Sequence, residues 1–198
     1  MKYENINYGS ELKRRKETFD RAMNAEGMEF KRIFQEVLTT QKQDGSFSLI
    51  EEYRIDADSR VAYGYVPTYY GTAIFMKADL KYHFERGTKE YAAFEKALNF
   101  SAGRNLKGAG YSETEGMIEA FHIFMKAGLF QWMNQTKFQD NVFVACIHDQ
   151  LKKMEKEIDH GDCIHDWNHD FTKEFSEIMK EYYKNTQVGE RMTFTEKL

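Results

Sequence analysis

The chain has 198 residues, of which 41% are hydrophobic and 15% aromatic, and its formal net charge is −4. This length suits one domain with a sizeable core, and the single proline argues against disorder and against a loop-rich β architecture. Acidic and basic residues are interspersed, which disfavours nucleic acid as a partner, because nucleic-acid binding needs a clustered basic face.

The start of the chain and its cysteines bear on the expected compartment. Residues 1–5 lack the apolar segment of a secretion signal, and no stretch has the length of a membrane span. The two cysteines, Cys146 and Cys163, are too few for a disulfide framework. We therefore expect a cytoplasmic protein with reduced thiols that does not bind membranes.

Apolar residues recur at spacings of three and four along most of the chain, which is typical of amphipathic helices. In chain order, this periodicity predicts helices at about 12–23, 30–42, 67–84, 89–105, 113–129, 143–158 and 171–182. The stretch 48–66 differs, because it contains tyrosine, valine and isoleucine, which favour strands. The expected fold class is all-α, built of stacked helical hairpins, with a short irregular or β-like insertion.

One pentapeptide occurs twice: Ile-Phe-Met-Lys-Ala fills residues 74–78 and again 123–127. Each copy follows a helix and a glycine-aromatic turn, so each belongs to a helical hairpin that must stack on a neighbour to bury its apolar face. We expect the phenylalanine and methionine of each copy to pack inside and the lysine to lie outside. The chain then forms a single all-α domain, 1–198, with repeat units at 28–86 and 88–131 and C-terminal helices within 138–185.

Two motifs flank the insertion of the first unit. They are Gln41-x-x-Asp44-Gly45-Ser46-Phe47 and Val66-Pro67-Thr68-Tyr69-Tyr70-Gly71-Thr72-Ala73. The pair resembles a repeat unit of the α/α-toroid superfamily, which includes terpenoid cyclases, protein prenyltransferase β subunits and (α/α) carbohydrate-active enzymes. The resemblance covers roughly residues 30–130 and implies outer helices joined to inner helices around a pocket. It also implies an incomplete toroid, because this chain holds fewer hairpins than a closed one, and closure by association as a homo-oligomer.

Parallel stacking of the hairpins would bring the turns and the insertion to one end of the array, around the mouth of any pocket. Carboxylates there could serve as acid and base on a glycosidic or allylic substrate, and tyrosines could bind a sugar. The candidate catalytic residues are Asp44, Asp58 and Glu115, and the candidate ligand-binding residues are Tyr63, Tyr65, Tyr69 and Tyr111. In the alternative interpretation, Asp44 caps its own turn, Glu115 completes a capping box at a helix start, and the tyrosines pack.

A second constellation has the residue types of a metal site. His160, Cys163, His165 and His169 lie within ten residues, and imidazole and thiolate are natural zinc ligands. His165 and His169 would share a helix face if the last helix began that early. The alternative is that they are ordinary loop and cap residues, since the spacing matches no common zinc motif. A possible Zn²⁺ is the one cofactor that the sequence suggests.

Three functions follow, in order of preference. The first is a hairpin-repeat domain that binds an unknown small molecule or protein, whether a sugar, a peptide or a second subunit, at its turn-rich end. The second is a carbohydrate-active or other α/α-toroid-type enzyme that uses acids at the pocket mouth. The third is a metal-dependent protein centred on residues 160–169. Terpenoid cyclase activity is disfavoured, because Ser59 stands where the class II acid motif has its last aspartate.

Overall fold

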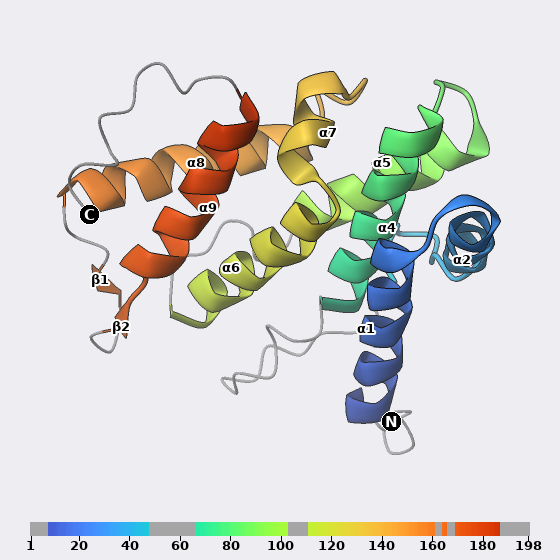
Figure 1. The fold of residues 1–198 in the computed structure, drawn as a ribbon, viewed down its shortest axis with the longest axis horizontal. Coiled ribbons are helices and arrows are strands. Elements are labelled where there is room, and N and C mark those ends of the chain that lie inside the picture. Colours follow the sequence, from blue (N-terminus) through green and yellow to red (C-terminus); the bar gives the residue numbers. More distant parts are fainter. Residues whose placement is uncertain (1–7, 48–65, 103–110, 161–163, 166–168, 187–198) are drawn as a thin grey trace.

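The computed structural model describes the chain except for residues 1–7, 48–65, 103–110, 161–163, 166–168 and 187–198 (Figure 1). Helices make up most of the described part, which confirms the predicted all-α class. They are α1 (Tyr8–Asn24), α2 (Gly27–Thr39), α4 (Val66–Tyr82), α5 (Lys89–Ala102), α6 (Tyr111–Lys126), α7 (Leu129–Gln135), α8 (Val142–His160) and α9 (Thr172–Thr186). β1 (Ile164–His165) and β2 (His169–Asp170) form a short antiparallel pair. Within these ranges, every helix is too short or too polar to cross a bilayer.

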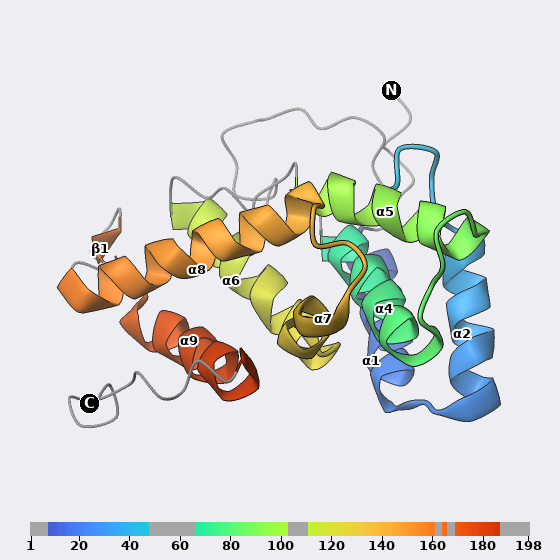
Figure 2. The ribbon, with the colours of Figure 1, turned by 90° about the horizontal axis from the view of Figure 1, so that it is seen from above.

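The helix α4 lies at the centre of the molecule and packs against α1, α2, α5, α6 and α7. Figure 1 shows α1, α4, α6 and α9 inclined in the same sense, and each packs on the next one in this order. In Figure 2, α5 and α8 lie along one side of this row. The first turns of α1, α4, α6 and α9 therefore lie toward the same end of the molecule, the lower end of Figure 1.

A continuous run of aromatic rings joins α2 to α8 through the core. Phe34 packs edge-on against Phe75 with centroids 5.0 Å apart, and Phe75 stacks on Phe94 at 5.9 Å. Phe94 lies 5.6 Å from Trp132, which in turn contacts Phe143 at 6.1 Å. All five rings are buried. Such aromatic pairs add about 0.5–1.5 kcal/mol each beyond the burial of apolar area, so the helices share one core.

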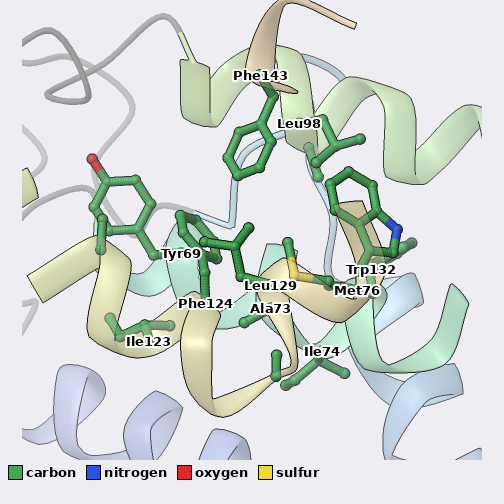
Figure 3. Packing of buried hydrophobic residues seen from close by; sticks show 14 of the residues in the cluster. Tyr69, Ala73, Ile74, Met76, Leu98, Ile123, Phe124, Leu129, Trp132 and Phe143 are labelled. Atoms are coloured by element: carbon green, nitrogen blue, oxygen red, sulfur yellow. The ribbon is translucent and has the colours of Figure 1, made fainter. Parts of the chain in front are cut away.

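Both copies of the repeated pentapeptide contribute to this core, on adjacent helices. Figure 3 shows Ile74 of α4 and Ile123 and Phe124 of α6 among the packed side chains. Phe75 and Phe124, the equivalent phenylalanines, are both fully buried. The methionines differ, since Met76 is fully buried whereas Met125 is only partly buried. The copies thus share their packing at the phenylalanine and diverge beyond it.

The two equivalent lysines have different surroundings. The side chain of Lys77 is 17% exposed, and its ammonium donates to the carbonyl oxygens of Ala22, Met23 and Ala25 at 3.0, 2.9 and 3.0 Å. Lys126 is exposed. The expectation that the lysine lies outside is thus right for Lys126 and wrong for Lys77. The reason is that α1 ends against α4, where its terminal carbonyls lack helical partners.

The hairpins also differ just after the pentapeptide, where Asp79 in the first unit corresponds to Gly128 in the second. The helix α4 continues past Asp79 to Tyr82, whereas α6 ends at Lys126 and the chain turns at Gly128 with φ of 87°. The left-handed conformation suits glycine and allows α7 to fold back. Trp132 of α7 then donates its indole N–H to Asp79 Oδ2 at 2.8 Å, so a buried hydrogen bond joins α7 to the end of α4.

Candidate functional site

The turn after α2 carries the motif that resembles the toroid family, and its residues bond within the turn and to α5. The Ser46 amide donates to Asp44 Oδ1 at 2.9 Å, so the carboxylate of Asp44 closes its own turn. The side-chain amide of Gln41 donates to the backbone carbonyls of Gly45 and Ala93 at 3.2 and 2.8 Å. These contacts match the structural interpretation of Asp44, which lies exposed at the surface.

Close packing explains the glycine and the phenylalanine of the same motif. Gly45 has φ of 93°, and a Cβ placed there would lie 2.3 Å from the carbonyl oxygen of Lys96 on α5. The ring of Phe47 lies on Gly71 of α4, where a Cβ would meet it at 2.3 Å. The Phe47 amide donates to Thr68 Oγ1 at 3.1 Å. The motif therefore fastens the first turns of α4 to the end of α2 and to α5.

Beyond this turn, polar side chains from three helices lie within electrostatic range of one another. They are Asp20 of α1, Tyr70 of α4, and Glu115 and Glu119 of α6, and we call them the Tyr70 site. The Tyr70 ring stacks on Phe19 of α1 with centroids 5.0 Å apart, and the residue is only 7% exposed. Its ring is therefore fixed against α1.

Burial and like charges raise the pKa values of two groups at the Tyr70 site. Desolvation raises the pKa of the Tyr70 hydroxyl to about 12, with smaller contributions from the negative charges of Glu119 and Asp20. Desolvation also raises the pKa of Glu119 above its ordinary value of 4.5, and the charge of Glu115 adds to the effect. Both groups therefore favour their neutral, proton-carrying forms.

Neither of these two groups is bonded to a neighbour in the described part of the chain. No hydrogen bond joins the Tyr70 hydroxyl or the Glu119 carboxyl to another described residue, although Glu119 is half-buried. Asp20, in contrast, is paired with Lys16, whose ammonium lies 2.7 Å from Asp20 Oδ2. The site thus brings together the Tyr70 hydroxyl and the Glu119 carboxyl, whose pKa is raised. This combination can donate and accept hydrogen bonds to a polar ligand.

The predicted site residues are placed as follows. Glu115 lies in the Tyr70 site, and Asp44 lies in the turn after α2. Tyr69 is 1% exposed and packs edge-on against Phe124 at 5.7 Å, so its ring is part of the core (Figure 3). Asp58, Tyr63 and Tyr65 belong to the stretch 48–65, which lies outside the described residues. Tyr111 is the first residue of α6, but the structure does not describe its side chain.

The proposed metal ligands fall in a part of the chain that is described only as backbone or not at all. Cys163 lies outside the described residues, and His160 is the last residue of α8. His165 and His169 are paired opposite each other in the β1–β2 pair. They do not share a helix face, because α9 begins only at Thr172. Among the side chains that the structure describes, no group of three metal-binding residues comes together.

Sequence reasoning missed Tyr70 and Glu119. A usable signal was present for Glu119, because it follows Glu115 by four residues and therefore lies on the same face of α6. It also lies between Ile118 and Ala120, which are both buried. Tyr70 was adjacent to the predicted Tyr69, but the sequence does not show which of the two rings faces the acids of α6.

Comparison of the chain with protein-family models, with curated proteins and with solved structures found no match.

Proposed function

We propose that the protein is a helical-hairpin scaffold that binds an uncharged polar ligand of the carbohydrate class at the Tyr70 site. The observation that carries the proposal is that the buried Tyr70 and the half-buried Glu119 have no side-chain hydrogen-bond partner among the described residues, while burial raises the pKa of both groups. Both groups are partly withdrawn from water, so a ligand that bonds to them would replace weak hydration with direct hydrogen bonds. A bound hydroxyl-rich ligand would provide the missing partners.

Charge supports the choice of ligand class. Asp20, Glu115 and Glu119 gather carboxyl groups around the Tyr70 hydroxyl, so a phosphate or carboxylate ligand would be repelled. A neutral sugar has hydroxyls that both donate and accept, and a ring face that can lie on an aromatic side chain. Tyr70 and Glu115 lie in the second turns of α4 and α6, and these two helices begin toward the same end of the molecule. We propose that the helical hairpins form an open, toroid-like array and that the pocket mouth lies at this end of it.

Binding can be tested by ligand-observed NMR with maltose and cellobiose as probes and glucose 6-phosphate as the charged comparison. We expect saturable binding of at least one neutral disaccharide and weaker binding of the phosphate. Tyr70→Phe keeps the ring on Phe19, and Glu119→Gln keeps the size of the side chain. Each should weaken binding about tenfold, as the loss of one hydrogen bond to a ligand implies. Equal binding by both variants and by the wild type would refute the proposal.

The unequal surroundings of Glu115 and Glu119 favour glycoside hydrolysis as a second candidate. Glu119 retains its proton to a higher pH than an ordinary glutamate, whereas Glu115, one helical turn away, is exposed. Acid-base hydrolysis of glycosides uses two carboxyl groups in different environments, one of them with a raised pKa. Release of nitrophenol from aryl glycosides would reveal this activity. Catalysis requires both carboxyls, so turnover that survives Glu119→Gln would exclude this role.

A further inference from the structure

A second hollow lies at the opposite end of α4. It has a volume of about 320 Å³ and is lined by α2, the end of α4 and the connection to α5. This volume is at the lower end of the range for small-ligand pockets. Tyr82 lies at this end and Tyr70 near the other, twelve residues earlier, which corresponds to about 18 Å along a helix. We call this hollow the His83 groove, and it is separate from the Tyr70 site.

Aromatic rings form the floor of the His83 groove. Phe34 and Phe84 stack with centroids 5.6 Å apart and are 2% and 6% exposed. Tyr82 is 40% exposed, and its ring is held by stacking on Phe30 at 6.1 Å. The floor is therefore rigid and apolar, and a flat ring of a ligand could lie on it.

Opposite charges lie on the two walls of the groove. Lys31 and Gln35 come from α2 and share a helix face, being four residues apart. Glu85 and Glu90 come from the connection after α4 and from the first turn of α5. None of these four side chains forms a hydrogen bond or an ion pair with another described residue. The groove thus presents a cation on one wall and carboxylates on the other, all available to a ligand.

The backbone of His83 supplies an independent indication of a site. His83 has φ of 51° and is the one non-glycine residue with positive φ in the described part of the chain. Its amide donates to the Asp79 carbonyl at 2.8 Å, so it occupies the left-handed position that ends a helix. Glycine is the usual residue there, because a side chain in this conformation is strained. Strained residues cluster at functional sites, and His83 is one of the residues that line the groove.

We infer that the His83 groove binds a free amino acid with an aromatic side chain. The ligand's ring would lie on the floor of Phe34 and Phe84, and its ammonium would be paired with the carboxylates of Glu85 and Glu90. Its carboxylate would accept hydrogen bonds from Lys31 and from an imidazole N–H of His83. A zwitterion with a ring matches the two charged walls and the apolar floor, whereas a sugar or a phosphate matches only part of them.

The first test is calorimetric titration of the full chain with L-phenylalanine, phenylalaninamide and N-acetylphenylalanine. We expect saturable binding of L-phenylalanine with a dissociation constant below about 1 mM. Each derivative lacks one of the two charges and should bind about tenfold more weakly, since hydrogen bonds to charged groups are the strong ones. If L-phenylalanine does not bind, or if glucose binds in its place, the inference is wrong.

The second test separates a ligand-binding His83 from a simple helix cap. His83→Gly relieves the strain and removes the imidazole, so the melting temperature should stay the same or rise while binding of L-phenylalanine falls about tenfold. His83→Asn tolerates the same backbone and should behave likewise. His148→Gln, at an exposed histidine of α8, is the control and should bind as the wild type does. Wild-type affinity in His83→Gly would show that the histidine serves only the backbone and would overturn the inference.

Discussion

The contrast between Lys77 and Lys126 leads to a quantitative prediction, because the same residue in two copies of one peptide has different surroundings. The ammonium of Lys77 is bonded to three carbonyl oxygens at the end of α1 and lies 4.9 Å from the centre of the Phe30 ring. In the variant Lys77→Met the apolar stem is kept and the charge is lost. The three carbonyls would then lose their hydrogen-bond donor, and little water could replace it, because the side chain at this position is only 17% exposed.

The expected loss follows from these contacts. A hydrogen bond to a charged group contributes about 1.5–3 kcal/mol, and a cation at the negative end of a helix dipole up to about 2 kcal/mol. These contributions overlap and do not add, so we expect Lys77→Met to lower the free energy of unfolding by about 3 kcal/mol. For a chain of this size, each kcal/mol corresponds to about 2–4 °C in melting temperature. The melting temperature should therefore fall by about 6–12 °C.

Thermal and urea unfolding, followed by circular dichroism, can measure this loss against a matched control. Lys126→Met is the same substitution at the equivalent position of the second copy, where the lysine is exposed, and should change stability by less than about 0.5 kcal/mol. The reasoning fails if the two variants lose similar amounts, or if Lys77→Met is as stable as the wild type.

Two further predictions concern the carboxyl groups of Asp79 and Glu119. Asp79→Asn should lower the free energy of unfolding by about 1–3 kcal/mol and change the near-ultraviolet signal of Trp132. The reason is that the carboxylate accepts two N–H groups, one on each oxygen, whereas an amide has only one oxygen. Unchanged stability in urea unfolding would argue against the bond between Asp79 and Trp132. Glu119 has a raised pKa in the folded state, so its contribution to stability is present below pH 4.5 and is lost as the pH rises through the raised value. The stability of Glu119→Gln relative to the wild type should therefore grow as the pH rises from 4.5 through the raised pKa of Glu119. The gain should be smaller in a Glu115→Gln background, where one cause of the raised pKa is absent. A stability difference that is constant with pH would contradict the raised pKa of Glu119.

Periodicity was sufficient to predict most of the helices but not the short ones or the exact ends. The predicted helix at 113–129 combined α6 with the first residue of α7, because the apolar spacing continues through Gly128 and only the left-handed backbone there separates them. The short strand pair was expected in the insertion at 48–66, of which all but Val66 lies outside the described residues, whereas β1 and β2 occur at 164–170. A pair of two-residue strands is too short to leave a periodic pattern.

The candidate site was predictable in its location along α6 but not in its composition. Glu115 was identified from its place near a helix start, while Glu119 was overlooked although it follows on the same helical face. What makes Glu119 distinctive is desolvation, which depends on how α4 and α6 pack and is not visible in a single sequence. The same limit applies to Lys77, because the carbonyls that surround it come from a helix more than fifty residues earlier.

The bond between Asp79 and Trp132 limits how this array can grow. Trp132 bonds to Asp79, which directly follows the first pentapeptide, whereas Gly128 follows the second. If residues 88–131, extended to include the rest of α7, were duplicated in tandem, the added tryptophan would face a glycine instead of a carboxylate. A buried indole N–H without an acceptor costs about 1–3 kcal/mol, so each added unit would weaken the stack. The two copies of the pentapeptide are therefore not interchangeable, because only the first is followed by the carboxylate that accepts the bond from Trp132.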